Sequence, residues 1–476
     1  MNKIIKETKK EVDINSSIKK TGLKSIEENY FDSDVKKNNA YSNETQVNVN
    51  KKAIELKKIK KFFFKEFFDR ISYGFGSQQF INILFFQTGA SYFVIGIING
   101  LRLILSVIIT SFLDEYSKVR QISKKFIGAT GIIFGLSFIF MAMARFFHSV
   151  LLFALALLIG SIGAVSYGEL YQKTFMDAIK KERSKLLRNI AQYGLIITGA
   201  SILLAGFLMD KFPSIGTPTS LFGFKFRVFG YLIAFEIAAI SSIIAGYIFS
   251  FVKEKQIQFA EKRSPLTQIK IQFNNIKDSL SVFIKNKVIL ILFIASIITG
   301  FVQILGNSYY GIYIYETFKY TYFGGFTNVA VIFLIAIMAS FFAPFIARKN
   351  SREYGKFPML VFGTLLMAIM PLTYYYNPNL VSISIGTLIG FIGAAIVGVS
   401  HGLLISDLMP ENKRKIYFSA YGILITIPYI IMIPTGAYIA QIYGLKTLFL
   451  LLGLILTLVV VPLYLLILII HKKEKI

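Results

Sequence analysis

The chain contains long stretches of apolar residues with few or no charges, such as 94–110, 151–164 and 448–470. A helix needs about 20 predominantly apolar residues to cross the hydrocarbon of a bilayer. Lipid offers an exposed backbone no hydrogen-bond partner, so only helices and closed barrels span it. Strands of a barrel would alternate apolar and polar residues. These stretches are continuously apolar, and the sequence therefore predicts an all-α membrane protein.

The formal net charge of +26 would also fit a nucleic-acid-binding protein. The basic residues, however, lie between the apolar stretches, on alternate loops. This pattern is typical of a membrane protein whose basic loops face anionic lipid. We therefore expect the basic loops to interact with the lipid bilayer and not with nucleic acid. The chain has no cysteine, which excludes disulfides, cysteine metal sites and thiol chemistry.

Composition divides the chain into five parts. Residues 1–60 are polar and predict a disordered basic cytoplasmic tail. Residues 61–252 and 287–471 each contain six apolar stretches, which predict an N-terminal and a C-terminal six-helix bundle. Residues 253–286 form a cytoplasmic central loop, and 472–476 a second cytoplasmic tail. The twelve expected helices are 62–88, 92–113, 124–144, 149–172, 188–209, 227–252, 287–315, 324–347, 357–375, 380–404, 416–440 and 445–470.

The loops give an orientation. Those after the second, fourth, eighth and tenth helices carry clusters of Lys and Arg, whereas 87–91 and 377–379 are nearly uncharged. Basic loops stay on the cytoplasmic side. We therefore expect a multi-pass protein of the cell membrane with both termini in the cytoplasm.

The two halves share short segments in the same order. LIGSIGAVSYG at 158–168 matches LIGFIGAAIVG at 388–398 in seven of eleven positions. Glu-Tyr-x-Lys follows the second helix at 115–118 and the eighth at 353–356, and Tyr-Gly opens the fifth helix at 193–194 and the eleventh at 421–422. Apolar helices look alike by chance, but that does not explain matches between polar loops. The pattern predicts an internal duplication.

Two six-helix halves joined by a basic loop resemble the major facilitator superfamily, over residues 62–470. Asp114 and Lys118 remain from that family's loop motif, whereas Thr110, Ser117 and Glu115 replace its two glycines and an arginine. The resemblance implies two pseudo-symmetric bundles that give alternating access to a central cavity. It also implies a cytoplasmic latch between the loop around Asp114 and Lys118 and the loop around Arg352.

Two pairs of polar residues occupy corresponding helices of the two halves. Gln78 and Asn82 on the first helix, and Gln303 and Asn307 on the seventh, have i, i+4 spacing and so share a helix face. In the family that the chain resembles, both helices line the cavity, which makes these residues candidates for substrate binding. Amide hydrogen bonds between helices are the alternative. Tyr310 follows on the same helix and is a candidate for stacking on a substrate.

Several titratable residues are candidates for coupling or gating. The segment EFFDRISY at 66–73 looks like the Glu-x-x-Glu-Arg-Phe-x-Tyr-Tyr motif of proton-coupled peptide transporters, which implies a coupling role for Asp69 and Arg70. A structural ion pair at the inner face is the alternative. Glu169 and His401 lie near the cytoplasmic ends of the fourth and tenth helices, where they could titrate during transport or be solvated gate residues.

Arg102 is a charged residue inside an apolar helix. It lies ten residues after Tyr92, hence about 15 Å deep at 1.5 Å per residue, in a layer about 30 Å thick. An arginine at that depth needs an anionic or carbonyl partner. One possibility is a permanent pair with a carboxylate such as Glu236. The other is that its planar guanidinium binds an anionic group of a substrate.

Signatures of enzymes and pumps are absent from the sequence. It has no Gly-x-x-x-x-Gly-Lys-Ser/Thr loop, no His-Glu-x-x-His and no Gly-x-Ser-x-Gly. Its three histidines are too scattered for a metal site. We therefore expect neither an enzyme nor a cofactor or metal, but a monomeric secondary transporter, either symporter or antiporter. Its candidate partners are a small solute, with an anion as one option, and protons. A non-transporting sensor or lipid-handling protein with the same fold is the alternative.

Overall fold

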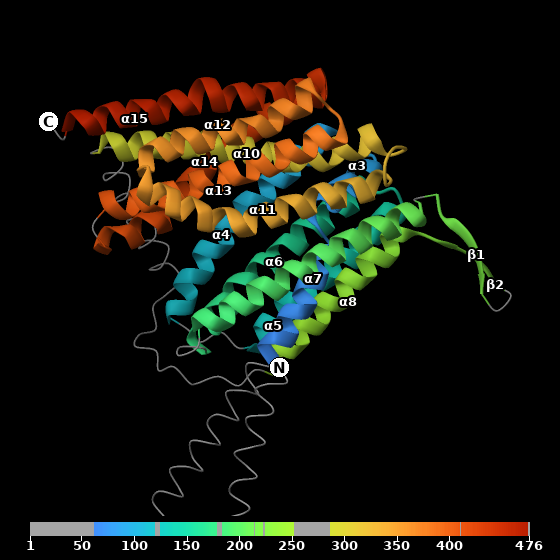
Figure 1. Ribbon diagram of the computed structural model, residues 1–476. Helices are drawn as coiled ribbons and strands as arrows, with labels where there is room; N and C mark the ends of the chain where they lie inside the picture. The colour runs from blue at the N-terminus through green and yellow to red at the C-terminus, as the bar shows by residue number, and fades with distance from the viewer. Residues whose placement is uncertain are drawn as a thin grey trace, which may run out of the picture. The chain divides into compact units, whose positions relative to one another are not determined.

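The computed structural model describes residues 61–119, 124–178, 183–213, 215–221, 224–251, 286–409 and 411–474. These residues are mostly helical (Figure 1). A first helix covers 61–75. It is followed by α3 (Gln78–Gln87), α4 (Tyr92–Val119), α5 (Lys124–Phe146), α6 (Val150–Ala178), α7 (Arg183–Lys211), α8 (Gly230–Ser250), α10 (Lys287–Phe318), α11 (Gly325–Glu353), α12 (Lys356–Tyr376), α13 (Leu380–Leu408), α14 (Glu411–Ile455) and α15 (Val461–Glu474), with a π-helical turn at Leu456–Val460.

Ten helices in the described part of the chain are long and apolar enough to cross a membrane. The last of them, Tyr421–Ile470, is 50 residues long and contains Gly444 with non-helical angles of φ 81° and ψ 166°. The first predicted helix, 62–88, is not among the ten, because Gly76 and Ser77 divide it into 61–75 and α3. A side chain at Gly76 would overlap the ring of Phe138, so the break lies where α5 approaches closely.

A small β-hairpin corrects the all-α prediction. Strands β1 (Thr217–Leu221) and β2 (Phe224–Val228) pair antiparallel, with Thr217 opposite Val228. The hairpin joins α7 to α8 and projects beyond the ends of these helices (Figure 1). Gly216 precedes it with φ +83°, a backbone conformation that glycine adopts without a steric penalty.

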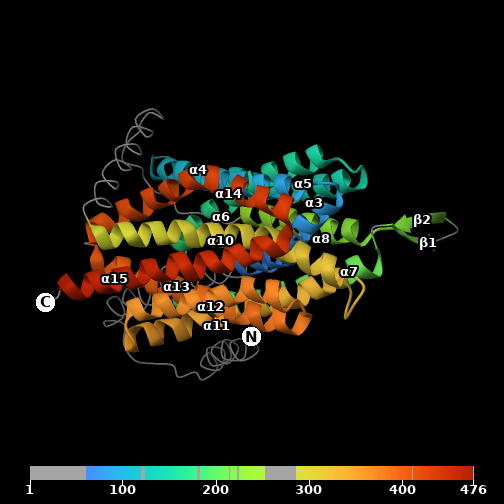
Figure 2. The same cartoon turned by 90° about the horizontal axis from the view of Figure 1, so that it is seen from above.

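Helices that are distant in sequence lie side by side. Helix α4 packs against α14, α7 against α11, and α3 against α10; Figures 1 and 2 both show α4 along α14. Within each stretch of sequence, α5 packs against α6 and α8, and α12 against α13. Small residues permit the closest approaches, as at Gly128 and Gly246, where an added Cβ would meet backbone atoms of the other helix.

Two predicted domains cannot be compared with the structure. The tail at 1–60 lies outside the described residues, and so does the central loop at 253–286 except for its last residue. Asn286 is described, and its side chain caps α10 by accepting hydrogen bonds from the backbone N–H groups of Val288 and Ile289.

Candidate functional site

Four polar side chains of α3 and α4 form one hydrogen-bonded network. Gln78 donates to Asn82 at 2.8 Å and to Asn99 at 3.1 Å, and Asn99 donates to Asn82 at 3.2 Å. Arg102 donates through Nη1 to Gln78 and Asn99. The spacings i, i+4 on α3 and i, i+3 on α4 place both pairs on one face of their helices, so the two faces meet.

Arg102 has only neutral partners. Besides Gln78 and Asn99, its Nε donates to the hydroxyl of Ser161 on α6 at 2.6 Å. The predicted pair with Glu236 is wrong, because Glu236 is exposed on α8 and Arg102 forms no ion pair with any described carboxylate. Its Nη2 likewise has no hydrogen-bond partner among these residues. The guanidinium therefore keeps its charge and two N–H donors for a further partner.

The network continues into α10. Asn82 donates to the backbone carbonyls of Asn307 and Ser308, and Asn99 donates to the Ser308 hydroxyl at 3.1 Å. Gln79, which was not among the predicted site residues, donates to the carbonyl of Asn307 at 3.1 Å and accepts from the N–H of Gly311 at 3.1 Å. Its amide thus satisfies the two backbone groups that an i→i+4 helical hydrogen bond would join.

Two adjoining cavities open beside this network. One, of about 550 Å³, is lined by Arg70, Gln78 and residues of α7 and α11. The other, of about 180 Å³, is lined by Gln303, Tyr310 and apolar residues of α12 and α13. Asn307 and Phe391 line both. Four predicted substrate-binding residues (Gln78, Gln303, Asn307 and Tyr310) therefore line these two cavities, and Arg102 adjoins the larger one through Gln78.

The smaller cavity has an aromatic and sulfur-containing wall. Tyr310 is buried, stacks on Phe449 and tilts against Tyr374. The amide of Gln303 points at the sulfur of Met367, 3.9 Å away. His401 lies outside this wall; its Nε2 is 3.1 Å from the hydroxyl of Ser296 on α10. The lining is suited to an apolar or aromatic group rather than to a second charge.

A compact set of charges occupies the first helix. Asp69 pairs with Lys65 at 2.5 Å, and Glu66 lies 3.3 Å from Lys65 and 3.4 Å from Arg70. Lys65, not singled out from the sequence, is buried, and its ammonium lies over the rings of Tyr167 and Tyr171. Asp69 and Arg70, for which a structural ion pair was the alternative to a coupling role, thus both belong to a four-charge cluster. The i, i+4 spacing of Lys65 and Asp69 was the available signal.

One end of the helices is closed by contacts between distant segments. Asp210, at the end of α7, accepts hydrogen bonds from the first turn of α11. The hydroxyl of Tyr309 on α10 donates to the carbonyl of Tyr92 on α4 at 2.8 Å. Both contacts lie at the end that carries the hairpin. None of these residues was predicted as functional, because their role depends on which segments meet.

Glu169 and Arg352 do not line these two cavities. Glu169 is half-buried on α6 and has no hydrogen bond or ion pair with a described residue. Arg352 is exposed near the end of α11. Asp114 and Lys118 belong to α4, but their side chains lie outside the described residues, so the predicted latch is not visible.

The chain is similar to known transporters. The sequence profile of the Major Facilitator Superfamily matches residues 67–428. No curated protein sequence matches the chain. A mutant of the nucleoside transporter NupG has a TM-score of 0.69 and 14% identity, covering 86% of this chain and 99% of that one.

Two other solved structures are similar in fold. A bacterial homologue of the iron transporter ferroportin, in its inward-facing state, gives a TM-score of 0.62 with 12% identity, covering 87% of this chain and 98% of that one. A mutant of the peptide transporter POT, in complex with sulfate, gives 0.59 with 13% identity, covering 87% and 94%. At these identities the likeness shows the fold alone.

Proposed function

Because this chain belongs to the Major Facilitator Superfamily, we propose that it is a secondary transporter of a small anionic solute. The observation that carries the proposal is Arg102, whose three hydrogen-bond partners are neutral and whose Nη2 has no partner among the described residues. A guanidinium inside the hydrocarbon is stabilised by a carboxylate or phosphate, to which the N–H groups of Nη2 can donate. The solute would provide that group.

We place the solute across both cavities. Its anionic group would bind Arg102, with Gln78 and Asn99 holding the guanidinium in position and Asn82 bonded to both of them. The rest of the solute would extend past Asn307 toward Gln303 and Tyr310, where the wall is apolar and aromatic. A solute with an acidic group and an apolar or aromatic part fits these linings.

Twelve crossings in two six-helix halves form part of this proposal. Ten helices qualify as spans, Gly444 divides the 50-residue one in two, and 61–75 with α3 adds a broken one. The neighbours α4 and α14, and α7 and α11, come from opposite halves of the sequence. Rocking at these contacts would open the cavity to each side in turn. The contacts of Asp210 and Tyr309 would hold the outer side closed.

Ion coupling is proposed at the charged groups nearest the path. Arg70 lines the larger cavity and contacts Glu66, so the cluster with Asp69 adjoins the solute space. His401 and Glu169 are further candidates, and Asp114, Lys118 and Arg352 would act at the cytoplasmic latch. The basic loops support cytoplasmic termini.

Uptake by purified protein in liposomes tests the proposal. Solutes with a carboxylate or phosphate would first be screened for an increase in the thermal midpoint, since only ligands of the folded state raise it. We expect Arg102→Gln to fold but to lose uptake of the solute found, and Arg102→Lys to retain little of it. Arg227→Gln, an exposed arginine on the hairpin, is the matched control. Normal uptake by Arg102→Gln would exclude the substrate role.

The same assay distinguishes a transporter from the alternative, a non-transporting sensor or lipid-handling protein. A sensor or lipid-handling protein would bind the solute without accumulating it, whether or not a pH gradient is imposed. Accumulation that follows an inward proton gradient would identify a proton symporter, and accumulation against it an antiporter.

A further inference from the structure

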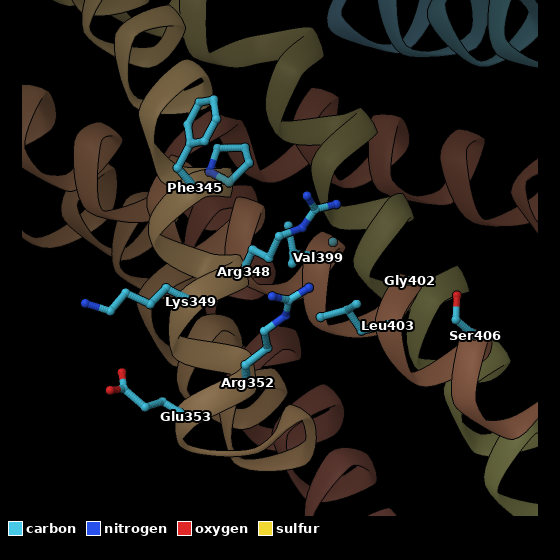
Figure 3. A pocket seen from close by; sticks show the side chains of 11 residues that line it. Phe345, Arg348, Lys349, Arg352, Glu353, Val399, Gly402, Leu403 and Ser406 are labelled. Atoms are coloured by element: carbon cyan, nitrogen blue, oxygen red, sulfur yellow. The ribbon is translucent and has the colours of Figure 1, made fainter. Parts of the chain in front are cut away.

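A third pocket, of about 890 Å³, lies between α11 and α13, near the C-terminal ends of both helices. Figure 3 shows Arg348 and Arg352 of α11 directed across it toward α13, while Lys349 and Glu353, which also line the pocket, point away from the two arginines. The i, i+4 spacing of the two arginines places both guanidinium groups on the same face. The two guanidinium groups therefore lie together on the wall that α11 forms.

No described carboxylate neutralises these two arginines. Glu353 also lines the pocket, but its side chain points away from the two arginines (Figure 3) and forms no ion pair with either of them. Asp407, the nearby acid of α13, is paired with Lys356. Arg348 and Arg352 form no ion pair with a residue in the described part of the chain, and both are exposed. Two unpaired cations one helical turn apart repel each other, and a shared anion removes that repulsion.

The opposite wall leaves room for such an anion. At Gly398 and Gly402 of α13, an added Cβ would find no atom within 4 Å. The two helices are nevertheless fixed to each other, because the buried hydroxyls of Ser351 and Ser400 are hydrogen-bonded at 2.8 Å. Ala347 is also fully buried at this contact. The pocket is thus a space beside a rigid helix pair.

The pocket continues the face that lines the larger cavity. Phe341 borders that cavity, and Phe345, Arg348 and Arg352 follow at intervals of four, three and four residues along α11. On α13, Phe391 borders both inner cavities, and Gly398 and Gly402 follow at intervals of seven and four. These intervals keep one helix face. The arginines therefore lie about 10 to 17 Å farther along the same path, at 1.5 Å per residue.

We propose that Arg348 and Arg352 form a second anion-binding site, which takes a phosphate group. A single carboxylate satisfies one guanidinium, whereas a phosphate dianion has enough oxygens for two guanidinium groups. The phosphate belongs either to a soluble solute on its way to or from the central cavity, or to a lipid headgroup at the bilayer surface. The site rests on the proposed function only in the first case.

The absence of tryptophan from the chain makes binding directly measurable. Phe345→Trp places a single tryptophan in the wall of the pocket, and the full chain is then held in nanodiscs. In one arm, inorganic phosphate is titrated into phosphatidylcholine nanodiscs. In the other, phosphatidic acid replaces part of the lipid and no phosphate is added. A saturable fluorescence change in the first arm identifies soluble phosphate as the ligand, and a change in the second arm alone identifies the headgroup.

Three variants of this reporter decide the outcome. Arg348→Gln with Arg352→Gln should raise the apparent Kd by roughly tenfold or more, as loss of a charge-assisted contact does. Lys349→Gln, which removes a lining charge directed away from the two arginines, should change it by no more than about twofold, because solvent and salt screen that charge. Gly402→Leu should abolish the response by filling the space without altering charge.

The proposal is overturned by several results. One is the absence of a saturable response in both arms together with no phosphate- or lipid-dependent rise in the thermal midpoint. Another is an equal Kd in the double arginine variant and in Lys349→Gln. Arg102→Gln in the reporter background should bind normally; a lost response there would place the anion in the central cavity instead. Because no transport is measured, failure of the proposed function leaves this test intact.

Discussion

The carboxylate of Asp210 on α7 binds Thr327 on α11 twice, accepting from its backbone N–H and from its hydroxyl, each at 2.7 Å. The other oxygen accepts from the N–H of Phe326 at 3.0 Å. Helix α11 begins at Gly325, and its cap residue Gly324 offers no side chain for these N–H groups. An acid from a distant helix thus caps α11 and meets the positive end of its dipole.

Removing the charge of Asp210 should favour opening at this end of the helices. Asp210→Asn retains one acceptor oxygen but loses the charge-assisted contacts, each of which contributes about 1.5–3 kcal/mol. We expect spin labels on α7 and α11 to show a larger population of long distances across this end. Lys211→Gln, at the neighbouring exposed residue, should leave the distances unchanged. Identical distributions in the parent and Asp210→Asn would exclude a closing role for the contact.

Gly324 offers a test that leaves the carboxylate in place. It has φ +108°, and an added Cβ would lie 2.5 Å from Oδ2 of Asp210. Gly355 has a similar φ of +90°, but its nearest neighbour, a Pro358 carbon, is 3.6 Å away. Alanine at either position brings backbone strain of about 1–3 kcal/mol. Only Gly324→Ala should also open the α7–α11 contact in the spin-label measurement, so similar distances in both variants would contradict the steric account.

The helices are predictable because apolar stretches in a bilayer have no other means of satisfying their backbones. The structure differs from the predicted helices in two places, and both depend on contacts that the local sequence does not encode. The break at Gly76 occurs where α5 packs against the first helix. The strands β1 and β2 have five residues each, too few to show a clear alternation beside long apolar helices.

The site is predictable in part. The depth of Arg102 follows from the rise of a helix, and Gln78 and Asn82 from their spacing. The hydrogen-bond partners of Arg102 depend on how α4 is rotated about its axis against α3 and α6, and helix packing determines that rotation. For the same reason Glu236 was a wrong partner, since that residue faces outward from α8. Asn99, one turn before Arg102, is the residue that the spacing argument could have reached.

The cluster on the first helix should respond unequally to loss of its two central charges. Lys65→Met leaves Asp69 buried and without its partner, at a cost of roughly 3–5 kcal/mol. Asp69→Asn costs less, because Lys65 keeps Glu66 at 3.3 Å and the two tyrosine rings. Thermal unfolding in detergent should therefore show the larger decrease for Lys65→Met. Adding Asp69→Leu to Lys65→Met should recover most of it, and equal effects of the two single variants would contradict this pairing.

Gln79 allows the contact of its amide with the backbone of α10 to be tested by comparing two substitutions of similar size. In Gln79→Leu, the helical hydrogen bond from the N–H of Gly311 to the carbonyl of Asn307 is available without the amide, so the loss of stability should be small, about 1 kcal/mol. In Gln79→Glu, one carboxylate oxygen still accepts from Gly311, but the other faces the carbonyl oxygen of Asn307, where Nε2 formerly donated. Two acceptors in contact inside the bilayer repel each other, and the charge has no cation among the described partners of Gln79. We therefore expect thermal unfolding to rank the parent first, Gln79→Leu close behind and Gln79→Glu well below. If Gln79→Glu were as stable as Gln79→Leu, the contact of the amide with these two backbone groups would not contribute as proposed.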